Sequence, residues 1–225
     1  MTNNGFSVPA APENYEQKCC CALVLDVSSS MDGEPINQLN QGLQSFYNDI
    51  LNDSTTANRL EVALVEFGSS VETIVDPSLI TNFQMPVLHS KGTTKLVDGV
   101  LEGISIVRMR KLWYKSTGQP YYRPWVILIT DGAPDIDQNV TALANEIREG
   151  MGKKEFYFFA IGVTNANMQM LESISDTSMP PAKLDGLKFS EFFRWLSASM
   201  AAVTKSTTGT ANMANPGSWM QGLQV

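Results

Sequence analysis

Strand-like and helix-like patterns alternate along most of this chain, and this alternation restricts the possible folds more than any other feature. Short apolar runs typical of buried strands are separated by stretches whose apolar residues recur every three or four positions, the spacing of one helix face. The predicted strands are residues 19–25, 60–67, 71–75, 125–130, 155–163 and 182–184. The predicted helices are residues 35–52, 95–114, 139–151, 168–175 and 189–203. Such an order is typical of an α/β domain with a mostly parallel sheet.

The connections predict how the strands are arranged. Only Gly68, Ser69 and Ser70 separate the second and third strand runs, and so short a link allows only an antiparallel hairpin. Residues 125–130 are almost entirely apolar, as expected for a central strand that is covered on both faces. We therefore expect a doubly wound, mostly parallel six-stranded sheet with one antiparallel edge strand and helices on both faces.

Composition excludes several kinds of partner. Hydrophobic residues make up 43% of the 225 residues, which is enough for one substantial core. The formal net charge of −7 argues against non-specific binding to nucleic acid. No stretch approaches the apolar length of a membrane span. We expect neither a nucleic acid nor a membrane as partner.

The three cysteines are adjacent, from Cys19 to Cys21, at the start of the first predicted strand. Zinc sites space their cysteines by two to four residues and need further ligands, whereas this chain has no other cysteine and only one histidine, His89. We interpret the cysteines as small apolar strand residues. Unpaired thiols, together with an N-terminus that lacks a signal-peptide pattern, predict a cytoplasmic protein.

Oxygen-bearing side chains follow the first predicted strand at alternate positions. Asp26, Ser28 and Ser30 come directly after the apolar run, and alternate residues of an extended chain point to the same side. One carboxylate and two hydroxyls can therefore reach the same point, and hard oxygen donors of this kind favour a cation such as Mg²⁺. Ser29 faces the other way, and we do not expect it to be a ligand.

Two further segments can complete this site. In doubly wound sheets, ligands bind beyond the carboxyl ends of the strands, at the point where the strand order reverses. If the order is 3-2-1-4-5-6, Asp26 and Asp131 end neighbouring strands and face one crevice. The loop of residues 90–94, which precedes the second long helix, can supply another hydroxyl.

These segments resemble the von Willebrand factor type A (VWA) domain with a metal-ion-dependent adhesion site. The motif of that family is Asp-x-Ser-x-Ser after strand one, a Thr in a Gly-rich loop, and an Asp after strand four. The matching segments are Asp26-Val27-Ser28-Ser29-Ser30, Gly92-Thr93-Thr94-Lys95-Leu96 and Thr130-Asp131-Gly132. The resemblance implies metal binding by Asp26, Ser28, Ser30, Thr94 and Asp131, with Thr93 as the reserve for Thr94.

The resemblance also implies a function. Because hydroxyl ligands are neutral, a bound Mg²⁺ or Mn²⁺ keeps much of its positive charge. An acidic side chain of a protein partner can then bind at the remaining coordination position of the cation. Ca²⁺ is the less expected ion. The implied protein is an interaction module and not an enzyme. Its VWA domain covers residues 18–205, between flexible segments at residues 1–17 and 206–225.

A narrower resemblance is to the bacterial TerY-like group. The residues that carry it lie in segments 30–36, 122–126 and 192–199. That group is associated with tellurium resistance and chemical stress, and its members are often encoded beside a protein kinase and a phosphatase. The resemblance implies partners of these kinds.

Other functions stay open at this point. Haloacid-dehalogenase-like phosphatases also place an Asp after strand one, and Asp26 would be their nucleophile. Those enzymes use a second Asp two residues later as general acid, and Ser28 cannot serve that role near neutral pH. A receiver domain clusters several acids, unlike this hydroxyl-rich set. A further alternative is a scaffold in which the ion only ties the three loops together.

Overall fold

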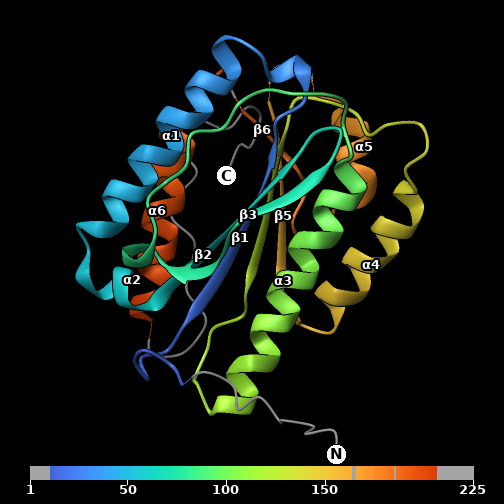
Figure 1. The fold of residues 1–225 in the computed structure, drawn as a ribbon. Coiled ribbons are helices and arrows are strands. Elements are labelled where there is room, and N and C mark those ends of the chain that lie inside the picture. Colours follow the sequence, from blue (N-terminus) through green and yellow to red (C-terminus); the bar gives the residue numbers. More distant parts are fainter. Residues whose placement is uncertain (1–10, 164–165, 185, 207–225) are drawn as a thin grey trace, which may run out of the picture.

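This computed structural model describes residues 11–163, 166–184 and 186–206. A sheet of six strands lies at the centre of the domain (Figure 1). The strands lie in the order β3 (Val71–Leu79), β2 (Leu60–Phe67), β1 (Cys19–Asp26), β4 (Trp125–Thr130), β5 (Tyr157–Gly162) and β6 (Ala182–Lys183). All neighbouring strands pair in parallel except β3, which is antiparallel to β2. The predicted fold class, including its antiparallel edge strand, is confirmed.

Helices cover both faces of the sheet (Figure 1). One face carries α1 (Glu34–Leu51), α2 (Ser54–Arg59) and α6 (Phe189–Lys205), and the other carries α3 (Leu96–Thr117), α4 (Val140–Gly152) and α5 (Met168–Ile174). Short 3₁₀ turns follow β1 (Ser29–Met31) and β3 (Ile80–Asn82). Within the described ranges, no helix combines the length and apolar character that crossing a membrane requires.

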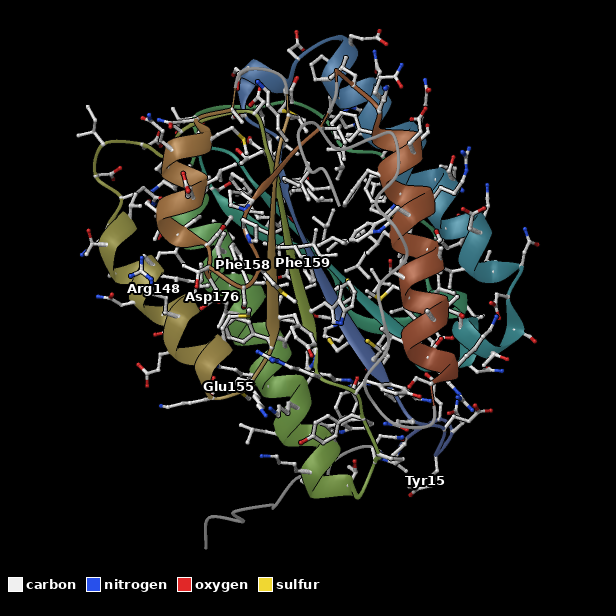
Figure 2. All side chains as sticks on the ribbon, turned by 180° about the vertical axis from the view of Figure 1, so that it is seen from behind. Tyr15, Arg148, Glu155, Phe158, Phe159 and Asp176 are labelled. Atoms are coloured by element: carbon white, nitrogen blue, oxygen red, sulfur yellow. The ribbon has the colours of Figure 1, made fainter. Side chains whose placement is uncertain are left out.

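Alternation along the strands divides the core into two layers. Figure 2 shows this on β5, where Phe158 and Phe159 lie on opposite sides of the sheet. Phe158 belongs to the layer beneath α3, α4 and α5, and Phe159 packs against the layer beneath α1 and α6. The cysteines divide in the same way and are all fully buried, as strand residues in a central position should be. Burial raises the pKa of the Cys19 thiol to about 12.

Some element boundaries differ from those predicted. β3 continues through Pro77 to Leu79, beyond its predicted end at residue 75. Pro77 lacks a backbone N–H, which is tolerated because β3 is an edge strand. α3 continues to Thr117, and Gly118 caps its C-terminus in the left-handed conformation, with a φ of 70°. α2 was not predicted, because its six residues are too few to show a period. The predicted domain limits at residues 18 and 205 stay predictions, and residues 1–10 and 207–225 of the predicted flexible segments lie outside the described residues.

A buried ion pair joins α3 to β2. Glu61 is only 2% exposed. Its carboxylate accepts hydrogen bonds from Nε and Nη2 of Arg110, at 2.6 and 2.7 Å, and from the hydroxyl of Tyr114 at 2.5 Å. All three groups depend on one another, since removing the carboxylate leaves a guanidinium and a phenol without their acceptor.

We expect Glu61→Ala to lower the free energy of unfolding by about 3–5 kcal/mol, because breaking a buried pair leaves an uncompensated charge. Urea unfolding would measure the change. Glu149→Ala is the control, since Glu149 pairs with Lys153 on the solvent side of α4 and its loss should leave the unfolding midpoint unchanged. Equal stability of the two variants would contradict the importance of this pair.

Candidate metal centre

The three predicted site segments meet at the carboxyl end of the sheet, at the top of Figure 1. The chain leaves β1 toward β2 on one side and β4 toward β5 on the other, so the strand order reverses between β1 and β4. These two strands are direct neighbours, with Leu25 paired with Ile129. Asp26 and Asp131 therefore emerge side by side, as the sequence predicted.

Asp26 lies at the bottom of the site and is completely buried. Its Oδ1 accepts a hydrogen bond from the backbone N–H of Ser28 at 2.8 Å. Its Oδ2 accepts one from the hydroxyl of Thr130 at 2.5 Å. The same Thr130 oxygen accepts the N–H of Gly132 at 3.1 Å. The carboxylate thus fixes the loop after β1 and the loop after β4 to each other.

A row of hydroxyls leads from this buried carboxylate to the surface. The Ser28 and Ser30 hydroxyl oxygens are 3.0 Å apart. The Ser30 hydroxyl donates to Oδ1 of Asp131 at 2.8 Å. Ser28 is buried, Asp131 is partly buried and Ser30 is exposed. The row therefore opens to solvent at its outer end, where another molecule can reach it.

Gly132 brings Thr94 to the same place. A Cβ atom built on Gly132 would lie 3.6 Å from Oγ1 of Thr94 and 3.7 Å from Oδ2 of Asp26. The two oxygens therefore border the same small space over this glycine. Thr93 is exposed, and its backbone N–H donates to the Ser69 hydroxyl at 2.9 Å. The structure brings Thr94, rather than Thr93, to the other four predicted residues.

Asp135 holds the Thr94 backbone in position. Its Oδ1 accepts the N–H of Thr94 at 3.1 Å, and its own N–H donates to the Thr94 carbonyl at 3.0 Å. The sequence did not indicate these contacts of Asp135 and Thr130. The only available signal was their position within a few residues of Asp131.

Backbone hydrogen bonds join the loop after β1 to the loop of residues 90–94. The N–H of Ser29 donates to the Gly92 carbonyl at 3.0 Å, and the N–H of Lys91 donates to the Val27 carbonyl at 2.6 Å. Gly92 has a φ of +77°, and a Cβ there would lie 2.0 Å from the Ser69 hydroxyl oxygen, so only glycine fits. The Ser29 hydroxyl donates to the Gly92 carbonyl at 2.9 Å and takes no part in the hydroxyl row.

Burial dominates the electrostatics of the two carboxyl groups. It raises the pKa of Asp26 to about 6, although hydrogen bonds from Ser28 and Thr130 act in the opposite direction, and the nearby charge of Asp131 raises that pKa further. Burial also raises the pKa of Asp131, against the hydrogen bond from Ser30. Two neighbouring carboxylates with limited access to water are the kind of environment that a bound cation compensates.

The donor set fits a hard cation. It combines two carboxylates with three hydroxyls, and oxygen donors of this type suit Mg²⁺ and Mn²⁺ better than softer ions. The part of the chain that the structure describes contains no cluster of three or more His, Cys, Asp or Glu residues suited to a metal. A site built from thiolates, imidazoles or many acids is therefore not found there.

The other polar residues near the rim have local partners or face solvent. Asp32 accepts a hydrogen bond from the Ser90 hydroxyl at 2.6 Å. Glu34 accepts one from the side-chain amide of Gln38 at 2.6 Å. His89 is exposed on the loop before Ser90. None of them joins the hydrogen-bonded group around Asp26.

Comparison with known families identifies the domain family. A family model described as the von Willebrand factor type A domain matches residues 22–185, which is most of the chain. This chain belongs to the VWA domain family. VWA domains are generally interaction modules, and their metal-ion-dependent adhesion site binds a divalent cation. A search of curated protein sequences gives no match.

Solved structures share the VWA fold. The pilus adhesin SpaC from Lactobacillus rhamnosus GG has a TM-score of 0.66 at 14% identity, over 85% of this chain and 31% of that chain. The ArnB paralog VWA2 from Sulfolobus acidocaldarius has a TM-score of 0.55 at 15% identity, over 83% of this chain and 46% of that one. A third structure is proximal thread matrix protein 1 from the mussel byssus, with a zinc-occupied metal-ion-dependent adhesion site. Its TM-score is 0.55 at 18% identity, over 83% of this chain and 48% of that chain. This VWA domain spans less than half of each of these chains, and such identities show a common fold alone.

Thr130 gives a direct test of the buried framework of this VWA domain. We expect Thr130→Val to lower the free energy of unfolding by about 1–3 kcal/mol, because the buried Asp26 carboxylate loses a donor. Thr93→Val makes the same chemical change at an exposed position and should have little effect. Urea unfolding of both variants in EDTA would measure this, and equal unfolding midpoints would contradict the role given to Thr130.

Proposed function

We propose that this VWA domain binds a protein partner through a divalent cation, Mg²⁺ or Mn²⁺, that is held by Asp26, Ser28, Ser30, Thr94 and Asp131. The observation that carries the proposal is the convergence of side-chain oxygens from three loops far apart in the sequence. Asp26, Ser28, Ser30 and Asp131 form one hydrogen-bonded group, and Thr94 borders the same space.

The residues have different tasks in this proposal. The hydroxyls of Ser28, Ser30 and Thr94 are neutral donors, whereas Asp26 and Asp131 balance the positive charge and orient the hydroxyls. A bound divalent cation would supply an electrophilic position for a carboxylate oxygen of the partner. The exposed Ser30 and the partly buried Asp131 mark the side from which that carboxylate approaches.

The geometry of Asp26 argues against a phosphatase. The side chain has no exposed surface, and each of its oxygens already accepts a hydrogen bond. A nucleophilic carboxylate needs an oxygen that can reach the phosphorus atom, and Asp26 offers none. We therefore propose an interaction module without catalytic activity.

A purely structural ion is also disfavoured. The loop after β1 is joined to the Gly92 loop by backbone hydrogen bonds, and the Thr94 backbone is joined to Asp135 of the loop after β4. These contacts hold the three loops together through the chain's own groups. An ion is therefore not needed as their only link, which leaves its charge available for a partner.

Calorimetric titration with Mn²⁺ tests the metal site. We expect Thr94→Ala to weaken binding at least about tenfold, equivalent to about 1.4 kcal/mol, because it deletes one hydroxyl donor. Thr93→Ala is the matched control and should bind Mn²⁺ like the wild type. If the wild type gives no heat of binding, or if Thr93→Ala has the larger effect, the assignment of these five residues fails.

The biological setting that we propose is a bacterial chemical-stress system of the kind linked to tellurium resistance. The domain would act in the cytoplasm, with a protein kinase and a phosphatase encoded beside it as partners. Segments 30–36, 122–126 and 192–199, with their likeness to the TerY-like group, support this setting. An exposed Asp or Glu on either partner would provide the carboxylate.

A pull-down with the neighbouring gene products as prey tests the partner. We expect capture in the presence of Mg²⁺, and loss of capture both in EDTA and with Ser30→Ala. Ser29→Ala should capture normally, because the Ser29 hydroxyl faces the Gly92 carbonyl instead. Capture that is insensitive to EDTA would exclude a metal-bridged carboxylate, whereas EDTA-induced unfolding of the isolated domain would favour a structural ion.

A further inference from the structure

Helix α3 exposes apolar side chains on the face that points away from the sheet. Leu101, Met109 and Leu112 are 39%, 63% and 57% exposed. Elsewhere in the described residues the large exposed apolar side chains lie on separate elements, namely Tyr15, Leu51, Val87 and Ile136. The opposite face of α3 is buried against the sheet, where a Cβ on Gly103 would lie 2.5 Å from Val24. The helix is therefore apolar on both sides, which is unusual for a helix on the surface of a monomer.

The exposed residues of α3 form a continuous stripe. Six of them recur at intervals of three or four positions, namely Asp98, Leu101, Ser105, Met109, Leu112 and Lys115, and the seventh, Ser116, directly follows Lys115. This is the spacing of side chains that pack against a second helix. The small Ser105 lies near the middle, where two helices in contact come closest. The stripe extends over most of a helix of 22 residues, about 33 Å long.

The stripe is also complementary to itself. Leu101 and Leu112 lie at equal distances along the helix from a point between positions 106 and 107, and so do Asp98 and Lys115. If two α3 helices pair antiparallel about a twofold axis at that point, Leu101 lies beside Leu112 of the other copy. Asp98 then lies beside Lys115 of the other copy. A parallel pairing would instead place equal charges side by side.

We propose that α3 forms the interface between two copies of this chain, which pack antiparallel about a twofold axis. A closed symmetric dimer needs one patch that complements itself, and the α3 stripe meets this condition in both apolar contacts and charge. This proposal does not depend on the proposed metal-bridged function.

The surroundings of the stripe support a helix-mediated dimer. An open hollow of about 410 Å³ lies between α3 and β3, bordered by the apolar Pro77, Ile106, Met109 and Trp113 and by the polar Asp76, Glu102, Ser105 and Arg110. It offers a recess for an apolar side chain of the second copy. The neighbouring edge strand β3 carries Glu72, Asp76 and Pro77, which are typical of edges that avoid pairing with another strand. The helix, and not the sheet edge, is therefore the surface that fits a second copy.

Light scattering coupled to gel filtration, with protein from about 1 to 100 μM, tests the dimer. We expect the wild type to reach twice the 24.7 kDa chain mass as the concentration rises. Leu101→Glu and Leu112→Glu should each remain monomeric, because they place a charge in the apolar contact. Val87→Glu changes an exposed residue that lies beside α1, on the other face of the sheet, and should still dimerise. A wild type that stays monomeric throughout this range would overturn the proposal.

Cysteine cross-linking tests the orientation. The native cysteines are fully buried and should not react in the folded protein. A mixture of Leu101→Cys and Leu112→Cys chains should form a disulfide-linked dimer when oxidised glutathione is added, whereas each variant alone should form much less. Cross-linking of either single variant as efficiently as the mixture would exclude the antiparallel arrangement. Circular dichroism of each variant would establish that it is folded.

Discussion

The site depends first on the buried carboxylate of Asp26, which lies between two neighbouring strands. Because the strand order reverses between β1 and β4, this carboxylate can bind the Ser28 backbone on one side and the Thr130 hydroxyl on the other. The first contact sets the direction of the hydroxyl row, and the second sets the position of Gly132 beneath Thr94. A small shift of Asp26 would therefore displace donors from all three loops at once.

Most of the fold could be predicted because its signals are local. The apolar run of residues 125–130 indicated a central strand, and the three-residue link after Phe67 required an antiparallel neighbour. The five proposed ligands were named from the resemblance to the VWA motif, whose segments follow the first and fourth predicted strands or precede the second long predicted helix. α2 could not be predicted, because a helix of six residues that is capped by Asp53 shows no clear period.

The supporting contacts were not predictable from local patterns. Thr130 and Asp135 act through partners that are 104 and 41 positions away in the sequence, and nothing in their neighbourhood identifies those partners.

The second apolar face of α3 was also not predicted from local patterns. Three- or four-residue spacing predicts a helix with one apolar face, whereas the structure shows that Leu101, Met109 and Leu112 are exposed on the outer side of α3. The same helix begins directly after the Thr94 loop, and its Val97 N–H donates to Gln138 of the loop after β4 at 2.6 Å. In the proposed antiparallel dimer, the two proposed metal sites would therefore lie at opposite ends.

The central claim is that oxygens from three loops hold one cation at the carboxyl end of the sheet. Crystals of the wild-type protein soaked in Mn²⁺ test it most directly, because the anomalous signal of manganese locates the ion independently of any partner. We expect one strong peak within coordination distance of the hydroxyls of Ser28, Ser30 and Thr94, close to Asp131. A strong peak elsewhere, with none among these hydroxyls, would show that these oxygens do not form the cation site.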